Sequence, residues 1–542
     1  MEAPVDIPLT APHLTKDKEQ TSQPEEIAVR AVEAPRSDVW VLSHRKNGGR
    51  QAFLPDAESL EKLDTSKWNV TGILPGVFPE WLGDPGFTEH HGVRFPYVVG
   101  EMANGIATTD MVVAAARGGF LGVFGAAGLT VRQTEEGVGR IRRELGPGPG
   151  WAVNLIHSPT EPGVERGVVD MLLRERVPSV SVSAFMELTP SVVRLALSGI
   201  SERPDGSVHR PVRLMAKVSR PETATAFMSP APAALLERLR GQGLLSEDEA
   251  RLAARIPVAE DITAEADSGG HTDNRPLTAL LPRLLALRDS VARLHGCTVR
   301  VGAAGGLGTP HAVAAAFATG AAYVVTGSVN QTARESGISE QARTMLAAAD
   351  LPDMVMAPAA DMFELGVQVQ VLGKGTMFAR RARLLYRLYD QHDALEQLDE
   401  KTRARLERDV FRAPLADVWA QTEKFWSERD PGEIERAAAD PKHRMALLFR
   451  WYLGQSSHWA IRGEKDRTLD YQLWCGPALG AFNQWVSGSF LANTAERSVV
   501  QVGLNLLEGA ASHTRAQQLR SHGVRLPARA FSFRPRPLRQ SA

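Results

Sequence analysis

The sequence is poor in cysteine, in long apolar runs and in any excess of one charge. Its two cysteines, Cys297 and Cys475, cannot form a disulfide framework or a cysteine metal site, so we expect a reducing, cytoplasmic location. No stretch reaches the roughly 18 consecutive apolar residues of a membrane helix, and we expect no secretory signal in the first residues. Lysine plus arginine total 62 against 63 acidic residues. This balance gives no electrostatic footprint for nucleic acid or an anionic membrane.

Apolar residues make up 43% of the chain, which is enough for a sizeable core. Short β-branched runs alternate with amphipathic helical segments, and this alternation predicts parallel βαβ units. The runs cover residues 97–103, 121–125, 151–156, 179–184, 212–219, 261–267, 298–306 and 323–329. Eight such units in about 230 residues predict an α/β fold of the TIM (β/α)8 barrel type. An open doubly wound sheet is the alternative, because periodicity alone does not prove closure.

Composition outside these runs suggests further divisions of the chain. We interpret residues 331–510 as an added helical subdomain followed by an aromatic segment, both packing on the barrel. The aromatic stretch at 450–485 is interpreted as core packing, with a binding wall as the alternative. The remaining divisions are a disordered tail at 1–38, a lead-in segment at 39–96, the barrel at 97–330 with a helical insertion near 221–257, and a loose basic tail at 511–542.

The carboxyl ends of barrel strands are where such a fold carries its chemistry. Loops after the seventh and eighth strands commonly bind phosphate, and here both are rich in glycine, whose backbone amides can approach an anion closely. A helix beginning near Thr309 adds a favourable dipole. Simple tight turns are the alternative interpretation. The predicted cofactor residues at these strand ends are Met102, Ala103, Asn154, Lys217, Gly305, Gly306, Gly327 and Ser328.

A loop after the sixth strand, "EADSGGHTDNRP", holds a histidine behind two glycines. The backbone at Gly269 and Gly270 can pass close beneath a ligand, and the imidazole of His271 can donate a proton near neutral pH. An ordinary loop histidine is the alternative. Asp267, Asp273 and Asn274 flank this histidine, and we interpret them as turn-capping residues rather than partners that orient it. No spacing of histidines and carboxylates indicates a metal site.

Several motifs together carry a family resemblance. "GEMANGIATTDMV", "VNLIHSP", "EADSGGHTDNRP", "GAAGGLGTP", "APAADMFELGVQVQVLGKGT" and "FRWYLGQSSHWA" resemble the PfaD family, from about Leu82 to Ala510. These are trans-acting enoyl reductases of polyunsaturated fatty acid and polyketide synthases. The family is in turn similar to the flavin mononucleotide (FMN) barrels that include nitronate monooxygenases.

The resemblance implies FMN as cofactor, NADPH or NADH as reductant, and an enoyl thioester on an acyl carrier protein as substrate. It implies His271 as the catalytic residue over the flavin, with Gly269 and Gly270 beneath, and we keep His157 as a reserve proton donor. Asp361 and Glu364 near the implied mouth are interpreted as non-catalytic. A carrier protein could meet Arg380, Arg381 and Arg383, although a solvated helix face is the default. The alternatives are a nitronate monooxygenase-like flavin oxidase and a non-catalytic, flavin-bound component of a synthase.

Overall fold

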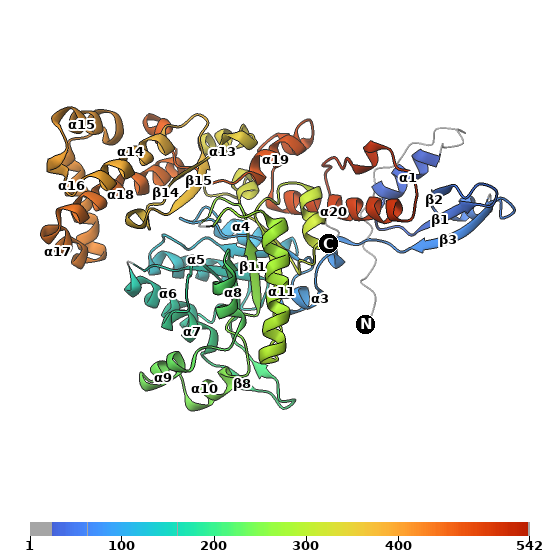
Figure 1. Ribbon diagram of the computed structural model, residues 1–542, viewed down its shortest axis with the longest axis horizontal. Helices are drawn as coiled ribbons and strands as arrows, with labels where there is room; N and C mark the ends of the chain where they lie inside the picture. The colour runs from blue at the N-terminus through green and yellow to red at the C-terminus, as the bar shows by residue number, and fades with distance from the viewer. Residues whose placement is uncertain (1–23, 62, 160, 271, 540–542) are drawn as a thin grey trace.

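Eight parallel strands form a closed barrel at the centre of the molecule (Figure 1). The computed structural model describes residues 24–61, 63–159, 161–270 and 272–539. The barrel order is β10-β11-β12-β13-β4-β5-β6-β7, so the predicted TIM barrel is confirmed and the open sheet is excluded. The strands are β4 (Tyr97–Val99), β5 (Leu121–Phe124), β6 (Trp151–Ile156), β7 (Ser179–Ser183), β10 (Arg213–Val218), β11 (Asp261–Glu265), β12 (Arg300–Ala304) and β13 (Val324–Thr326).

Helices follow the strands and cover the outside of the barrel. They are α4 (Thr109–Arg117), α5 (Val131–Leu145), α6 (Pro162–Arg174), α7 (Pro190–Leu197), α8 (Pro221–Met228), α11 (Leu277–His295) and α12 (Pro310–Ala318). Threonine side chains cap four of them by accepting a hydrogen bond from a backbone N–H of the first turn, at Thr108, Thr130, Thr189 and Thr309. Each cap ends a strand–helix loop on the same face of the barrel.

The segment predicted as a helical insertion, residues 221–257, contains the barrel helix α8 followed by α9 (Ala233–Gly241) and α10 (Glu247–Ala253). A short hairpin of β8 (Ser201–Glu202) and β9 (Val208–His209) lies beside α10. These elements lie at the end of the barrel away from the helical subdomain (Figure 1).

The helical subdomain has an apolar core of its own and covers the other end of the barrel (Figure 1). Its core includes Phe378, Phe411, Phe449, Tyr452 and Trp459, so part of the aromatic stretch is core packing. Its elements are α13 (Glu340–Ala347), β14 (Met354–Pro358), β15 (Gln368–Leu372), α14 (Phe378–Gln391), α15 (Glu400–Arg405), a π-helix (Leu406–Phe411), α16 (Leu415–Arg429), α17 (Pro431–Ala439) and α18 (Pro441–Arg462). The β14–β15 hairpin was not predicted from the sequence.

The prediction of loose termini is wrong for the described parts of both segments. Helix α1 (Pro24–Glu33) buries apolar side chains against α20 (Val499–Ser521), which continues past the predicted boundary at residue 510. The fully buried Arg515 donates hydrogen bonds to the backbone oxygens of Pro35 and Ser37. Residues 1–23 and 540–542 lie outside the described residues. The described parts of the two terminal segments pack together, because each supplies apolar surface that covers the other.

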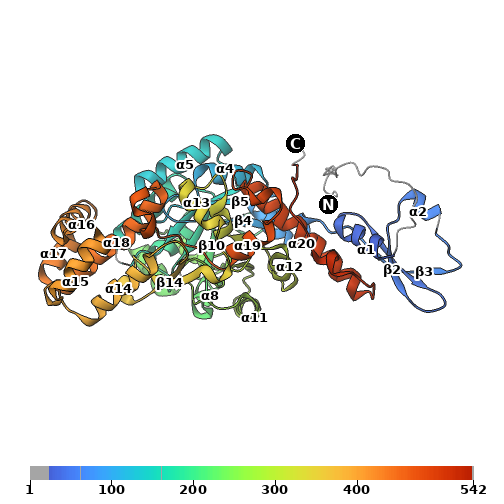
Figure 2. The same ribbon diagram turned by 90° about the horizontal axis from the view of Figure 1, so that it is seen from above.

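The lead-in segment at 39–96 contains an antiparallel sheet, which the sequence did not predict. Its strands are β1 (Val39–His44), β2 (Arg50–Phe53) and β3 (Trp68–Leu74), with β1 in the centre. Figures 1 and 2 both show α20 running from the barrel towards this sheet. The segment also holds short α2 (Ala57–Glu61) and α3 (Pro85–His91), and α19 (Ala478–Val486) packs beside the barrel. Among the described residues, no helix is both long and apolar enough to cross a bilayer.

A buried charged group closes the amino-terminal face of the barrel. Asp261 accepts hydrogen bonds from His91 Nε2 at 2.9 Å and from Arg300 Nε at 2.6 Å, and its side chain is fully buried. Burial would raise the pKa of Asp261, but hydrogen bonds from His91 and Arg300 and the charge of Arg300 hold it well below its usual value. Burial also lowers the pKa of His91, so the neutral imidazole donates.

The same group presents the one set of potential metal ligands found among the described residues. The ligand atoms of His90, His91 and Asp261 lie within 4.8 Å of one another. Both carboxylate oxygens of Asp261 already accept hydrogen bonds, and each of them is bound by the permanently charged Arg300. A cation would have to displace that guanidinium, so we assign the group to the structure of the barrel.

We expect Asp261→Asn to lower the free energy of unfolding by about 3 kcal/mol at neutral pH, because Arg300 loses its buried counter-charge. The folded pKa is depressed, so the wild-type advantage is complete above the unfolded pKa of about 4 and is lost as pH falls through the folded value. Urea denaturation of both proteins measures the difference. Glu144→Gln, in an exposed pair with Arg117, is the control and should cost less than about 1 kcal/mol. Equal stability of the Asn variant and the wild type at neutral pH would contradict the assignment.

Candidate functional site

A cavity of about 690 Å³ lies between the carboxyl ends of the barrel strands and the helical subdomain. The ten predicted cofactor residues all line it: Met102, Ala103, Asn154, Lys217, Gly269, Gly270, Gly305, Gly306, Gly327 and Ser328. His157 and Asp361 line it as well, whereas Asp273, Asn274 and Glu364 do not. His271 lies outside the described residues, directly after Gly270. The fold therefore brings to a single cavity strand ends that are more than two hundred residues apart in the sequence.

One wall of the cavity is formed by the glycine-rich turns after β12 and β13. Gly305 and Gly306 have successive positive φ angles of 89° and 73°, and a Cβ on Gly305 would lie 2.7 Å from the backbone of Ala266. A Cβ on Gly306 or Gly327 would meet no atom within 4 Å, because both face open space. Within the described ranges, no residue accepts a hydrogen bond from the backbone N–H of Gly306 or Gly327. Backbone amides that have no acceptor among the described residues and lie beside open space are candidates for an anion-binding nest.

Ser328 and Thr309 complete this wall. The Ser328 hydroxyl oxygen accepts a hydrogen bond from the Gly476 backbone at 3.1 Å, which leaves its hydrogen available to a ligand. Thr309 caps α12, which follows the turn, so the positive end of the helix dipole lies near the nest. Amides, a hydroxyl and a helix N-terminus together suit a phosphate group.

A buried charged triad lies at the ends of β4, β10 and β11. Lys217 Nζ is 2.8 Å from Glu265 Oε1 and 3.2 Å from Glu101 Oε1. Burial would lower the pKa of Lys217, but the two carboxylates outweigh burial and raise it above its usual value, so the amine is charged. Ser181 Oγ also donates to Glu101 Oε1 at 3.1 Å. The other oxygen, Oε2, is buried and accepts no hydrogen bond from any described residue. Such an oxygen requires a donor.

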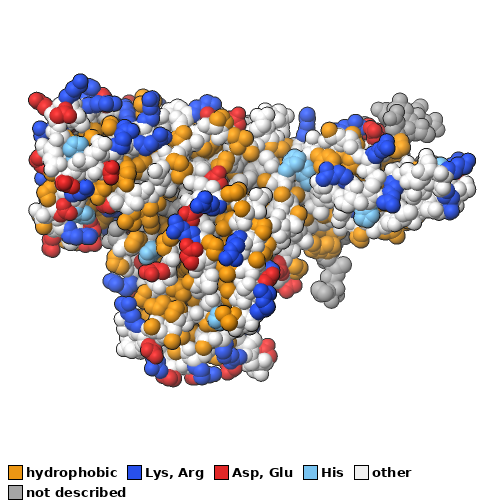
Figure 3. All heavy atoms as spheres, in the orientation of Figure 1, with side chains coloured by type: hydrophobic (Ala, Val, Ile, Leu, Met, Phe, Trp, Pro, Cys, Tyr) orange, Lys and Arg blue, Asp and Glu red, His pale blue; other side chains and the backbone are white. Residues whose placement is uncertain are grey.

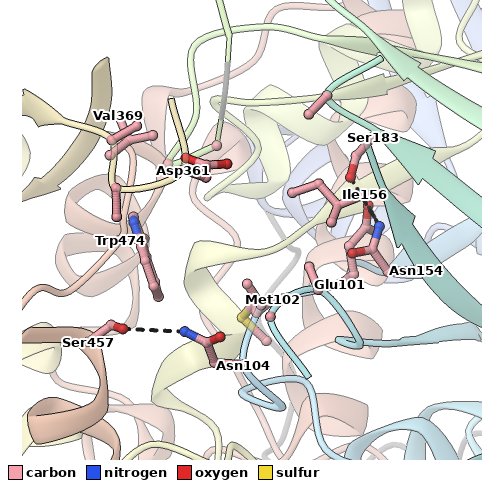
Figure 4. A pocket seen from close by; sticks show the side chains of 18 of the residues that line it. Glu101, Met102, Asn104, Asn154, Ile156, Ser183, Asp361, Val369, Ser457 and Trp474 are labelled. Carbon is pink, nitrogen blue, oxygen red and sulfur yellow. Dashed lines mark hydrogen bonds between the residues drawn. The ribbon is translucent and has the colours of Figure 1, made fainter. Parts of the chain in front are cut away.

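Asn154 is held beside this triad. Its Nδ2 donates to the backbone oxygen of Ser181 and to Ser183 Oγ, each at 3.1 Å, so its amide group has a defined orientation (Figure 4). Met102 lies in the lower part of the view in Figure 4, near Asn104, whose amide donates to Ser457 Oγ at 3.3 Å. Asn104 adopts a left-handed backbone with φ of 57°. This contact joins the barrel loop to the helical subdomain.

The acidic residues around position 271 have partners other than a histidine. Asp267 accepts a hydrogen bond from Gln370 on β15, and burial raises its pKa. Asp273 is paired with Arg220 at 2.8 Å. A Cβ on Gly269 would lie 3.0 Å from the Cys475 backbone, so the loop packs tightly under that segment. These contacts hold the ends of the loop between α8 and the β14–β15 hairpin.

His157 has a defined environment. Its Nδ1 is 2.9 Å from Glu165 Oε2, and its ring stacks on Phe185 at 4.9 Å between centroids. Hydrogen bonds from His157 and Thr189 outweigh burial and lower the pKa of Glu165. Because Nδ1 of His157 contacts Glu165, Nε2 is the ring nitrogen that can contact a ligand. Glu364, by contrast, pairs with Arg450 at 3.1 Å.

The opposite wall of the cavity comes from the helical subdomain, where the sequence analysis named no cofactor residue and gave a binding wall at 450–485 only as the alternative to core packing. Phe425 and Trp426 on α16 and Trp451 on α18 line it, together with Trp474 (Figure 4). An ion pair between Glu161 and Arg429 joins the loop after β6 to the end of α16. The clustering of aromatic residues was the sequence signal that could have identified this wall. In the structure these residues form both part of the subdomain core and part of the cavity wall.

Comparison with known proteins places this arrangement among (β/α)8 barrels with an added helical subdomain. The crystal structure of the enoyl reductase domain of MlnA, from the macrolactin biosynthesis cluster of Bacillus amyloliquefaciens, superposes with a TM-score of 0.78 at 34% identity. The alignment covers 82% of this chain and 99% of that domain. The chain therefore belongs to the family of enoyl reductase domains of polyketide and polyunsaturated fatty acid synthases, as its motifs predicted.

Longer synthase proteins contain the same region. The chain is 48% identical to one of the polyunsaturated fatty acid synthase proteins of Thraustochytrium sp. over 86% of its length, but it spans only 32% of that protein. It is 42% identical to the polyketide biosynthesis protein PksE of Bacillus subtilis over 82% of its length, and spans 58% of that protein. Residues 392–471 match the family model "[Acyl-carrier-protein] S-malonyltransferase, inserted helical domain".

Replacing Lys217, the cation of the charged triad, should make the free energy of unfolding depend on pH. In Lys217→Met, Glu101 and Glu265 lose their counter-charge, and we expect the free energy of unfolding to fall by about 3–5 kcal/mol near pH 8. The folded pKa of a buried carboxyl without its cation is raised. The loss should therefore shrink as pH falls towards about 5, where protonation removes the repulsion. Urea denaturation at both pH values measures it.

The matched control is the double variant Lys217→Met/Glu265→Gln, which removes one cation and one anion together. It should recover part of the stability near pH 8 and depend less on pH than the single variant. An equal loss at both pH values in Lys217→Met would show that packing, rather than charge, makes this lysine important.

Proposed function

We propose that this protein is an FMN-dependent enoyl reductase. It uses NADPH or NADH to reduce 2-enoyl thioesters on an acyl carrier protein during polyunsaturated fatty acid or polyketide biosynthesis. One observation carries the proposal: ten residues chosen at the strand ends line a single cavity, with a candidate anion nest in one wall and a buried carboxylate oxygen that accepts no hydrogen bond from a described residue. Membership of the enoyl reductase domain family supports the reaction class.

The residues present fit FMN. The nest at Gly306, Gly327 and Ser328 offers free amides and a hydroxyl to the phosphate. The buried Glu101 Oε2 offers an acceptor to the N–H of a pyrimidine-type ring. The cavity volume lies within the range of about 300–1,000 Å³ that is typical of small-molecule sites. When bound, the flavin would supply hydride-transfer chemistry between a nicotinamide and the enoyl carbon.

The chain's own residues would then position the substrate and move a proton. We propose His271 as the donor to the thioester side of the substrate and keep His157 as the second candidate, since it lines the cavity. A preorganised donor of this kind contributes about 3–4 kcal/mol to transition-state stabilisation. The aromatic wall from α16 and α18 would exclude water and receive the acyl chain.

A carrier protein as partner is supported by the helical subdomain. Its residues 392–471 match the inserted helical domain of an acyl-carrier-protein S-malonyltransferase, whose name states a carrier-protein substrate. The direct test of the whole proposal is the purified protein: its flavin absorbance should bleach with NADPH and recover on addition of a crotonyl thioester. Oxygen consumption with a nitroalkane and no response to the thioester would instead indicate a flavin oxidase. Flavin without NADPH-dependent turnover would indicate a non-catalytic component of a synthase.

Gly327→Asp should abolish FMN retention and leave the fold intact. Gly327 has φ of −119°, which other residues adopt, and a Cβ there meets open space. The added carboxylate would face the phosphate at short range in a partly dry site, where like charges repel strongly. Flavin content is measured by absorbance after gel filtration, and circular dichroism reports on the fold. Gly327→Asn, nearly equal in shape but neutral, should retain much more flavin. If the Asp variant keeps full flavin, the phosphate lies elsewhere.

His271→Ala should separate the two halves of the reaction. We expect normal FMN content and normal bleaching by NADPH, but recovery with a crotonyl thioester slowed by about 100-fold to 1,000-fold, because one donor is lost. Stopped-flow absorbance follows the two halves separately. His157→Ala is the matched comparison and should slow recovery far less. The opposite ranking would transfer the donor role to His157, and lost flavin in the His271 variant would make that residue a cofactor ligand.

A further inference from the structure

A second hollow, of about 560 Å³, lies on the helical subdomain between α14 and the α15–π-helix segment. Five arginines line it: Arg380, Arg381, Arg383 and Arg387 from α14 and Arg405 from α15. Figure 3 shows Lys and Arg side chains gathered at the upper left, over these helices. The whole chain has a formal net charge of −1, so the cluster does not follow from composition. We call these five residues the arginine groove.

Four members of the arginine groove are free to contact a partner. Arg381 is not, because it is largely buried and pairs with the fully buried Asp470. Arg380, Arg383, Arg387 and Arg405 are exposed, and none pairs with a carboxylate within the described part of the chain. The one acidic residue in the lining, Asp409, is already held by Arg408 at 2.8 Å and 3.0 Å. The sequence analysis named Arg380, Arg381 and Arg383 as possible contacts for a carrier protein. The structure removes Arg381 from this set.

The spacing of these side chains indicates an extended acidic ligand. Arg380, Arg383 and Arg387 are separated by three and four residues, so they share one face of α14. They extend over roughly 10 Å of helix, at about 1.5 Å per residue, which exceeds the width of one phosphate. Arg380, Arg383 and Arg387 pair with no carboxylate of a described residue and repel each other, and their forked donors match carboxylate and phosphate groups alike. A row of carboxylates on a protein surface satisfies both conditions.

We propose that the arginine groove is the docking surface for the acidic face of the acyl carrier protein, an inference that rests on the proposed function. Helix α14 packs directly on α18, and α18 supplies Trp451, Ser457 and His458 to the cavity wall. A carrier protein on α14 is thus seated on the same subdomain that encloses the substrate cavity. Exposed charge pairs of this kind act mainly on association rate and on salt dependence.

The test compares R380E/R383E/R387E with the wild type. With a crotonyl-loaded acyl carrier protein from a polyunsaturated fatty acid synthase, we expect kcat/KM to fall about 10-fold to 100-fold through KM, and its salt dependence to weaken. With the crotonyl thioester of N-acetylcysteamine, which lacks protein and phosphate, kcat/KM should be unchanged. The control R143E/R238E/R283E reverses three exposed arginines on α5, α9 and α11 and should behave as the wild type with both substrates.

Calorimetry with the holo acyl carrier protein separates docking from turnover. If the wild type reduces no thioester, the proposed function fails, but the binding difference between the groove variant and the control still decides the docking site. Equal binding by both variants overturns the proposal. Equal losses with crotonyl-coenzyme A and the loaded carrier protein, with the N-acetylcysteamine substrate unaffected, would also overturn it and assign the groove to a small phosphate ligand.

Discussion

Closure of the barrel by the β4–β13 pair is the constraint on which the rest of the molecule depends. Val324 pairs with Tyr97 and Thr326 with Val99, and the buried Tyr97 hydroxyl lies 2.6 Å from Thr326 Oγ1. This pairing joins the first and last strands of the barrel across more than two hundred residues. Because all eight strands are parallel, their carboxyl ends then share one face. Gly327 after β13 consequently lines the same cavity as Met102 after β4, and the charged triad joins three strand ends.

The helical subdomain completes the cavity through polar contacts and through Trp474, which packs against the apolar clusters of both units. The barrel and the subdomain have separate apolar clusters. Between them, Gln331 donates to the Trp474 backbone, Gln370 to Asp267 and Asn104 to Ser457. Each such bond contributes only about 1 kcal/mol net, so the two cores fold around their own apolar surfaces while the polar contacts set how they meet. The space that remains between them is the cavity, with carboxylates and amides on the barrel side and tryptophans on the other.

Sequence reasoning succeeded where a local pattern has one structural outcome. Alternation of β-branched runs with amphipathic helices predicted all eight strands within a few residues, because each pattern reports burial on one face of one element. It failed where the burial of an element depends on residues that are far away in the sequence. Helix α1 is short and lies in a polar segment, and its apolar face is buried by β2, by α20 and by the turn at Ala528–Phe531. The β14–β15 hairpin is a different kind of miss, because the apolar–polar alternation of Gln368–Leu372 was a local strand signal. In the folded chain β14 packs against α14. Arg381 and Arg383 look alike in sequence, yet one is neutralised by Asp470 and the other faces solvent.

The sequence by itself predicted the barrel, its glycine-rich strand ends and ten of the residues that line the cavity, because these follow from periodicity and from the rule that parallel strands end on one face. Its motifs predicted the family. The tertiary structure decided which of those groups lack hydrogen-bond partners. Lys217 is paired twice, one oxygen of Glu101 lacks a donor among the described residues, and Gly306 and Gly327 face open space. It also decided what encloses the cavity, since Trp426 and Trp451 reach it from a subdomain more than two hundred residues away from Asn154. Hydrogen-bond pairing and enclosure depend on groups distant in sequence, and only the folded chain brings those groups together.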